Sequence, residues 1–329
     1  MKEMQPKTTQ ETLLAVDRLS VEFATRRGTV RALENVSFDL KAGEIVGIVG
    51  ESGSGKSVLA FATMGILDRA GKITSGRILF DNIDLLQIKR SQLRQKRGKE
   101  LSMIFQNPRA ALNPIRKIGR QIEDVLQAHA NLPPKQRRER VLELLSLVRI
   151  SDPSRRYNAY PYELSGGMCQ RVTIALALAC SPRLAIADEP TTGLDVTTQA
   201  AVMDLIVDLA AQTHMATLLI THDLELAAQY CDRLVVMHAG HIVETAKTSD
   251  LFQHPRHPYT AKLIAATPDP EKDLAHLIPI PGNLPDLRGE LPFCRFRDRC
   301  DRASSQCDTV PLERKLVGNN HQVACHNHF

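Results

Sequence analysis

The spacing of apolar and polar residues predicts two kinds of strand in the first third of the chain. Residues 14–23 alternate between apolar and polar, and residues 32–40 do so less regularly, which predicts two strands of a half-exposed antiparallel sheet. Residues 73–84 have the same character and predict a further hairpin. Residues 45–49 form a short apolar run, which suits a parallel strand buried on both faces. The pattern therefore predicts an α/β core beside an antiparallel β subdomain.

Helical spacing replaces strand spacing in the middle of the chain. Residues 118–130 and 135–148 place apolar residues three and four apart, and Pro133 and Pro134 separate the two segments. We therefore expect residues 107–164 to form an all-helical insertion between two strands of the core. The strands predicted for that core are 45–49, 101–105, 184–187, 217–221, 233–237 and 241–244, with the last two completing the sheet.

The strand at 45–49 leads directly into a glycine-rich loop, G-x-x-x-x-G-K-S, and then into a predicted helix at 58–67. The glycines allow backbone N–H groups to surround a polyphosphate, and the helix points its positive end at the anion. Lys56 is expected to reach the β- and γ-phosphates, and the Ser57 hydroxyl to bind Mg²⁺. The residues predicted here to contact a nucleotide are Gly50, Ser52, Gly53, Ser54, Gly55, Lys56, Ser57 and Val58.

Acidic residues follow the apolar strand at 184–187. Asp188 and Glu189 come at its carboxyl end, where ligands bind in open α/β sheets. Asp188 is expected to hold Mg²⁺ through a water molecule, and Glu189 to orient and polarise an attacking water. His222 follows the strand at 217–221 and is predicted to lie at the same edge. This pattern indicates hydrolysis of a phosphoanhydride.

Two further signals are weaker. Ser165, Gly166 and Gly167 begin a predicted helix and could form a second anion site, although such a start is usually only a helix cap. An adenine base needs a flat partner upstream of the phosphate loop, where Phe23 is the aromatic residue available. Phe23 could equally belong to the core, and the guanidinium group of Arg27 could stack on the base instead.

The ordered set of motifs resembles the nucleotide-binding subunit of ATP-binding cassette (ABC) transporters, whose core is a P-loop NTPase fold. The resemblance spans residues 14–245. Its motifs, in family order, are the phosphate loop, Gln106, the L-S-G-G-x-x-Q signature at residues 164–170, Asp188 with Glu189, the turn Gly193-Leu194-Asp195, and His222.

The resemblance implies that two such domains dimerise head to tail around two molecules of ATP. Ser165 and Gly167, with Gly166 between them, would bind the γ-phosphate of the partner's site in trans, and Asp195 would contact the opposite subunit. Gln106 would sense the γ-phosphate and couple it to membrane subunits, and His222 would hold the γ-phosphate and the water in register with Glu189. The catalytic set is thus Lys56, Gln106, Glu189 and His222, and the Mg²⁺ set is Ser57, Gln106 and Asp188.

Two further stretches resemble the peptide-importer branch of this family, which includes oligopeptide and dipeptide permeases and some nickel, glycoside or glutathione importers. They are Asn107-Pro108 with Leu112-Asn113-Pro114, and His-Pro-Arg-His-Pro-Tyr-Thr at residues 254–260. The implied domains are a cassette at 1–250 and an extension at 251–329. Cys169 departs from the branch, which usually has arginine there, and could alter a contact with the membrane subunits. Gly193 stands where a small residue such as alanine is common.

Cysteines cluster in the extension, where Cys294, Cys300, Cys307 and Cys325 lie after a proline-rich segment with one short predicted helix at 260–266. Four thiols in so short a stretch suggest a metal rather than disulfides, although four ordinary thiols remain an alternative. Zinc bound by the four cysteines, or with His326, is open. The resemblance implies a structural [4Fe–4S] cluster, for which four cysteines suit. Arg295, Arg297, Arg299 and Arg302 could offset its charge or simply be solvated.

Composition limits the partners. The chain has 329 residues, is 43% hydrophobic and carries a net charge of +5. No apolar run approaches the ~18 residues of a membrane span, and the first residues lack an apolar signal core, so nothing argues for export. The basic runs at 89–99 and 135–140 are interpreted as solvated helix faces rather than a nucleic-acid surface. No nucleic-acid partner is therefore expected.

The function predicted is that of an ATPase subunit that drives import of peptides or similar solutes, placed peripherally at the cytoplasmic face of the inner (cell) membrane. The implied partners are a paralogous ATP-binding subunit, two transmembrane permease subunits and an extracytoplasmic solute-binding protein. A soluble cassette acting on DNA or ribosomes is the main alternative, but those proteins usually carry two cassettes or a long coiled-coil insertion. A Mg²⁺-dependent small-molecule kinase would have no use for the signature at 164–170.

Overall fold

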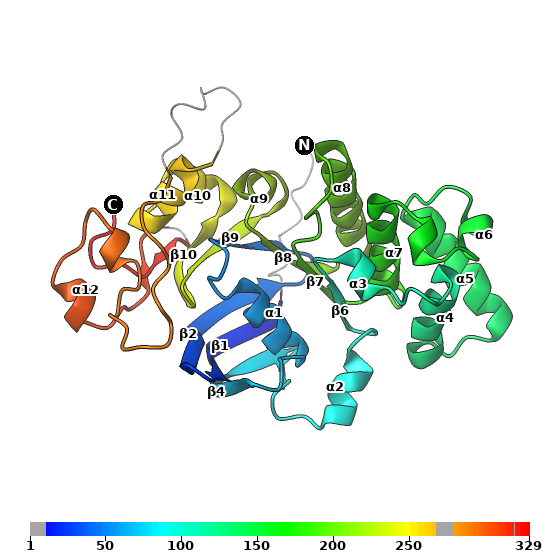
Figure 1. Ribbon diagram of the computed structural model, residues 1–329, viewed down its shortest axis with the longest axis horizontal. Coiled ribbons are helices and arrows are strands. Elements are labelled where there is room, and N and C mark those ends of the chain that lie inside the picture. The colour runs from blue at the N-terminus through cyan, green and yellow to red at the C-terminus, as the bar shows by residue number, and fades with distance from the viewer. Residues whose placement is uncertain (1–10, 268–278, 319) are drawn as a thin grey trace, which may run out of the picture.

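The computed structural model describes residues 11–267, 279–318 and 320–329, and Figure 1 shows two sheets with helices around them. The smaller sheet is antiparallel, in the order β2-β1-β4-β5. As predicted, its strands come from the alternating segments. β1 forms a hairpin with β2 and also pairs with β4, which forms a hairpin with β5. The bounds are β1 (Thr12–Thr25), β2 (Gly28–Lys41), β4 (Gly71–Phe80) and β5 (Ile83–Asp84).

The core sheet has the order β11-β12-β10-β9-β3-β8-β7-β6, and β9, β3, β8, β7 and β6 run parallel. Its central strand β3 is apolar throughout because both of its faces are covered. Val46 and Ile48 of β3 pack toward the antiparallel sheet and α1, whereas Ile45 and Val49 pack toward the helices on the other side. The bounds are β3 (Ile45–Val49), β6 (Leu101–Ile104), β7 (Leu184–Asp188), β8 (Ala216–Thr221), β9 (Arg233–His238), β10 (His241–Lys247), β11 (Lys315–Leu316) and β12 (Gln322–Val323).

The sequence pattern predicted that the sheet ends with residues 241–244, and this prediction was wrong. The extension adds β12 beside β10, with Glu244 opposite Val323, and β11 beside β12. These strands have only two residues each, which is too short for an alternating pattern to be recognised.

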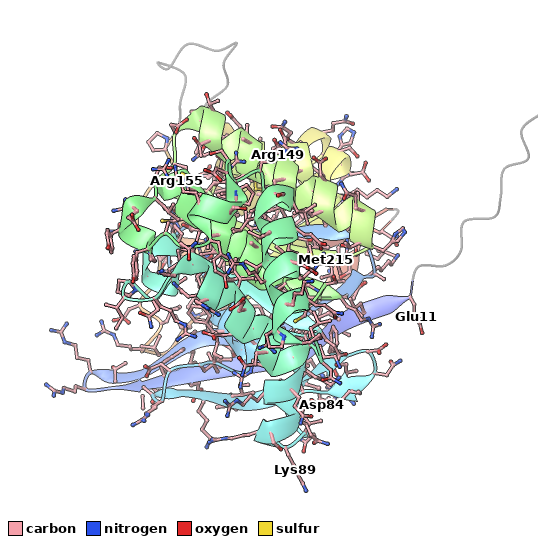
Figure 2. The ribbon with its side chains drawn as sticks, turned by 90° about the vertical axis from the view of Figure 1, so that its right-hand side faces the viewer. Glu11, Asp84, Lys89, Arg149, Arg155 and Met215 are labelled. Atoms are coloured by element: carbon pink, nitrogen blue, oxygen red, sulfur yellow. The ribbon has the colours of Figure 1, made fainter. Side chains whose placement is uncertain are left out.

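The helical insertion lies between β6 and β7, and Figure 1 shows it at the end of the molecule opposite the extension. It consists of α3 (Pro108–Ala111), α4 (Ile118–His129), α5 (Pro134–Leu147), α6 (Pro153–Arg156) and the first part of α7 (Gly166–Leu178). Tyr157 is fully buried there and packs against Gly119 of α4. Figure 2 views the insertion end-on, with Arg149 and Arg155 at its surface.

The remaining helices lie outside the insertion. They are α1 (Lys56–Met64), α2 (Arg90–Lys96), α8 (Val196–Thr213), α9 (Leu224–Tyr230), α10 (Thr248–Gln253), α11 (Pro258–Ala265) and α12 (Gln306–Thr309). The helix after the phosphate loop is shorter than predicted because Gly65 adopts a left-handed φ of 64° and ends it. The basic residues of 89–99 and 135–140 are exposed or half-buried, and Lys89 projects outward in Figure 2. Within the described ranges, no helix has the length and apolar character needed to cross a membrane.

The extension is anchored to the core sheet through Glu244 of β10, whose side chain is fully buried. Its carboxylate accepts hydrogen bonds from the backbone N–H groups of Arg256 and His257, at 2.6 and 2.9 Å. The ring of His321, which precedes β12, lies 2.6 Å from the same carboxylate. Because an unpaired carboxylate would be strongly disfavoured here, this cluster ties both halves of the extension to β10.

Candidate functional site

The phosphate loop connects β3 to α1 and closes on the amine of Lys56. The Lys56 Nζ donates to the carbonyl oxygens of Gly50 and Glu51, at 2.7 and 2.9 Å. Burial lowers the pKa of Lys56, and the carboxylates of Glu189, Asp188 and Glu51 oppose that shift. The conformation requires glycine at residue 50, where φ is +148° and a Cβ would lie 2.1 Å from the carbonyl oxygen of Met237. The loop thus presents backbone N–H groups beside a cation, as a polyphosphate site needs.

Ser57 and Asp188 meet at the carboxyl edge of the core sheet. The Ser57 hydroxyl donates to Asp188 Oδ1 at 3.1 Å. Burial raises the pKa of Asp188, and the Ser57 hydrogen bond opposes this shift. Hydroxyl and carboxylate oxygens are the donors that Mg²⁺ prefers, and this ion commonly completes its shell with waters and substrate phosphates. The pair therefore fits Mg²⁺, although no group of three or more His, Cys, Asp or Glu side chains in the described residues is arranged to hold a metal ion.

Glu189 is the centre of a hydrogen-bonded cluster at the same edge. Its Oε2 accepts from Gln106 Nε2 at 2.7 Å, and its Oε1 lies 3.2 Å from His222 Nδ1. Gln106, Glu189 and His222 follow β6, β7 and β8, so three neighbouring strand ends deliver the three predicted residues to one place. Glu189 has a φ of +46°, a left-handed value that is uncommon for a residue other than glycine. The carboxylate is held in one orientation, as a group that activates water must be.

Thr192 also contacts this carboxylate, and the sequence reading missed it. Its hydroxyl donates to Glu189 Oε2 at 3.0 Å. Thr192 reaches back because a turn follows Glu189, in which the Thr192 N–H donates to the Glu189 carbonyl oxygen at 3.2 Å. The sequence signal that could have found Thr192 is its hydroxyl group, three residues after Glu189 and next to the turn predicted at residues 193–195.

The signature segment lies elsewhere in the chain's own fold. Ser165 caps α7 by accepting from the Met168 N–H at 3.3 Å, and a Cβ on Gly167 would lie 2.8 Å from the Thr198 side chain. Asp195 caps α8 through Thr198. Ser165 and Gly167 thus contact their own α7 and the start of α8, and their action in trans remains a prediction. The side chain of Cys169 is buried and lies 3.5 Å from the Pro161 carbonyl oxygen, so it faces its own insertion rather than a partner.

The predicted adenine partners remain untested. Phe23 is half-buried on β1 and its ring packs over Gly71 of β4, and Arg27 is exposed in the turn before β2. Unexpectedly, the extension lies close to the phosphate loop and to the turn between β1 and β2. Leu284 is 3.3 Å from the place of a Cβ on Gly53, and Arg288 is 4.0 Å from that of a Cβ on Gly28.

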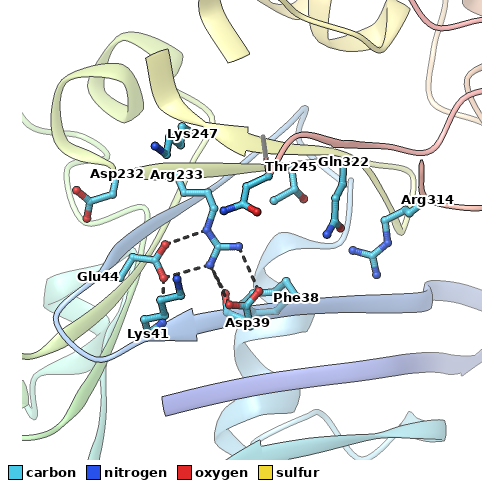
Figure 3. A pocket seen from close by; sticks show the side chains of 11 residues that line it. Phe38, Asp39, Lys41, Glu44, Asp232, Arg233, Thr245, Lys247, Arg314 and Gln322 are labelled. Carbon is cyan, nitrogen blue, oxygen red and sulfur yellow. Dashed lines mark hydrogen bonds and ion pairs between the residues drawn. The ribbon is translucent and has the colours of Figure 1, made fainter. Parts of the chain in front are cut away.

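A pocket of about 490 Å³ lies between β2, β9, β10 and the extension (Figure 3), and none of the predicted site residues lines it. Arg233 crosses it and pairs with Glu44 at 2.8 Å and with Asp39 at 3.3 Å. Since both carboxylates engage the guanidinium group, this cluster ties β9 to β2 and to the start of β3.

The four cysteines of the extension lie near one another, and all seven cysteines of the chain are free. Cys294, Cys307 and Cys325 are buried, and the Cys294 N–H donates to the Cys307 carbonyl oxygen at 2.9 Å. Burial raises the pKa of Cys294 to about 12, with smaller effects from Cys307, Cys325 and Cys300. In their present positions these thiols are not arranged to hold a metal ion.

Comparison with known proteins gives two family matches. Residues 33–192 match the family described as ABC transporter. Residues 243–307 match the family described as oligopeptide/dipeptide transporter, C-terminal region.

Individual proteins are similar over nearly the whole chain. A probable peptide ABC transporter ATP-binding protein of Sinorhizobium fredii is 45% identical over 98% of this chain and 97% of its own. The dipeptide transport ATP-binding protein DppD of Bacillus subtilis is 45% identical over 96% of this chain and 94% of its own. Among solved structures, a dimeric ATP-binding cassette in a post-hydrolysis state with ADP and Pi is 30% identical, with a TM-score of 0.64 over 71% of this chain and 98% of that one.

Proposed function

We propose that ATP hydrolysis by this chain energises the uptake of peptides or related small solutes. The chain belongs to the ABC transporter ATP-binding proteins of the oligopeptide/dipeptide type. The ATPase activity follows from the family. The observation that carries the proposal for the site is the convergence of Gln106, Glu189 and His222 beside the Ser57–Asp188 pair. Two similar proteins are named for peptide and dipeptide transport, which supports a peptide cargo.

In the proposed mechanism, Lys56 leaves its loop carbonyls and pairs with the β- and γ-phosphates of ATP. Ser57, Asp188 and Gln106 would hold Mg²⁺, which neutralises charge that develops on the phosphates. Glu189 accepts a proton from the attacking water, while His222 holds the γ-phosphate in register. The remaining nucleotide contacts are proposed for the backbone from Gly50 to Val58, and for Phe23 or Arg27 at the base.

The proposal extends to an assembly. Ser165, Gly166 and Gly167 of each cassette would close over the γ-phosphate bound by the other, so ATP would draw two cassettes together. We propose that the partner cassette is a paralogue of this chain. The complex would also contain two permease subunits and an extracytoplasmic solute-binding protein. The chain would then lie peripherally at the cytoplasmic face of the cell membrane, with residues 1–250 as the cassette and 251–329 as the extension.

The cysteines of the extension are proposed to ligate a [4Fe–4S] cluster, with zinc as the alternative. The support is the donor set, four neighbouring thiols in one small unit, because thiolates are the ligands that such clusters take. The thiols would need to deprotonate and move to bind it. No step of ATP hydrolysis is assigned to the cluster.

The test is uptake by the complete transporter in proteoliposomes loaded with ATP. Radiolabelled dipeptide, a longer peptide and nickel are offered in parallel, and the same complex carrying Glu189→Gln is the control. Peptide uptake that the variant lacks would support the proposal. Uptake of nickel alone would overturn the peptide assignment while leaving the ATPase assignment intact.

A further inference from the structure

Every polar group of Glu51, the second residue of the phosphate loop, has a partner. Its carbonyl oxygen accepts from Lys56 Nζ at 2.9 Å. Its backbone N–H donates to the Tyr259 hydroxyl at 2.9 Å. Its carboxylate takes two parallel hydrogen bonds from Arg299, both 2.8 Å. The Ser54 N–H also donates to the Glu51 carbonyl oxygen, at 3.2 Å. Glu51 thus has four partners, and two of them, Tyr259 and Arg299, come from the extension.

The Arg299 side chain is built to hold one position. Only 5% of it is exposed, against 28% for the Glu51 side chain. Its Nε donates to the Pro281 carbonyl oxygen at 2.8 Å, and its Nη1 lies 3.3 Å from His238 Nε2. A planar guanidinium group that binds a carboxylate through two bonds fixes direction as well as distance. Arg299 thus sets the orientation of Glu51 from the extension.

Tyr259 is equally fixed. Its side chain is fully buried, and its ring packs edge-on against His238 and Phe296. The residue begins α11 within the His-Pro-Tyr stretch, where the Tyr259 N–H donates to His257 Nδ1 at 3.0 Å. The hydroxyl therefore reaches Glu51 from a rigid support.

A second contact reaches the other end of the loop. Arg295 donates to the Ala239 carbonyl oxygen and pairs with Glu34. Gly240, which follows Ala239 in the turn between β9 and β10, donates its N–H to the Ser54 carbonyl oxygen at 2.8 Å. At this end the phosphate loop contacts the turn between β9 and β10, and Arg295 of the extension holds that turn.

We propose that Arg299 and Tyr259 are positioning residues for ATP binding, which fix the backbone shape of the phosphate loop through Glu51. When Lys56 turns to the phosphates, Glu51 loses one of its four partners, and the two from the extension remain. A loop fixed before ATP arrives loses less conformational entropy on binding. This inference rests on ATP binding by the cassette and is independent of the cargo.

The test uses two conservative variants of the full chain, Arg299→Lys and Tyr259→Phe. Arg299→Lys keeps the charge but loses the two parallel hydrogen bonds, and Tyr259→Phe removes the hydroxyl that accepts from the Glu51 N–H. Each is expected to weaken Mg-ATP affinity about fivefold, the effect of one lost hydrogen bond. In the assembled transporter, KM for ATP should rise by the same factor while kcat stays within about twofold. The loss of Mg-ATP affinity in the double variant should be smaller than the product of the two single losses, because both residues act through Glu51.

Arg297→Lys is the matched control, since Arg297 lies in the same turn but pairs with Asp298 and Asp308. Thermal unfolding reports whether each variant folds. Wild-type ATP affinity in Tyr259→Phe would overturn the proposal, even if Arg299→Lys did not fold. A fall in kcat at unchanged KM would also overturn it. Failure of the wild-type chain itself to bind ATP would contradict the family assignment instead.

Discussion

The Gln106 side chain donates to Glu189 Oε2 over 2.7 Å, which joins the ends of β6 and β7 through their side chains. Gln106 is also two residues before α3, the first helix of the insertion. A change at the Glu189 carboxylate can therefore reach the insertion through one hydrogen bond. The first two predictions concern this carboxylate.

Glu189→Gln should reduce ATP hydrolysis by the assembled transporter to a small residual rate. The amide cannot accept a proton from water, whereas the phosphate loop stays intact, so ATP binding should be retained and the closed dimer trapped. Phosphate release and nucleotide retention measure the two effects. Wild-type hydrolysis in this variant would refute the role assigned to Glu189.

Thr192→Val should lower kcat about tenfold with little change in ATP affinity. The variant removes a 3.0 Å hydrogen bond to Glu189 Oε2, and a bond to a charged group contributes about 1.5–3 kcal/mol. Steady-state kinetics separate kcat from KM. Thr213→Val is the control, because that hydroxyl bonds within its own helix to the Leu209 carbonyl oxygen. Equal kcat values in the two variants would show that the Thr192 hydroxyl has no role in hydrolysis.

Gly119→Ala should destabilise the insertion by about 1–3 kcal/mol, the usual effect of overpacking. The added Cβ would lie 2.3 Å from the buried ring of Tyr157. This clash outweighs the gain of about 1 kcal/mol in helix propensity. Urea unfolding measures the difference. Gly289→Ala has open space around it and is expected to have wild-type stability.

Acidification should weaken the docking of the extension. Burial lowers the pKa of His238 and of His257 to about 3, below the ordinary value of 6.5. The unfolded chain therefore binds these protons first as the pH falls, so the stabilisation is complete above about pH 6.5 and is lost toward pH 3. The slope is about 1.4 kcal/mol per pH unit for each histidine.

Urea unfolding between pH 7.5 and 5.5 tests this dependence. His238→Phe keeps a ring against Tyr259 and should show a flatter pH dependence than the wild type. His254→Gln, at an exposed residue, should leave the dependence unchanged. An identical slope in His238→Phe and the wild type would contradict the assignment.

Metal analysis of the anaerobically purified complex tests the cysteines. A [4Fe–4S] cluster predicts about four irons and four sulfides per chain, lost in Cys300→Ser. One zinc per chain would favour the alternative ligand. Absence of both would mean that the four thiols bind no metal.

Local sequence was enough to predict the longer strands and the phosphate loop, but not β11 and β12. β3 is apolar because both of its faces are covered, and the glycines of the loop are required by its backbone. Contacts across long stretches of sequence were not predictable in this way. Arg299 and Glu51 are 248 residues apart, and arginines beside cysteines gave no indication of which carboxylate they would meet. Thr192 was missed because its role depends on the turn that follows Glu189.

The short strand β12 covers the edge of β10 at Glu244 and Thr245. Without it, backbone N–H and C=O groups there would be free to pair with a strand of another molecule, which is a common route to aggregation. A chain cut after residue 250 would also leave Glu244 buried without the partners that Arg256, His257 and His321 supply. The extension thus keeps the edge of β10 from pairing with a strand of another molecule, and the solubility of the chain should depend on β12.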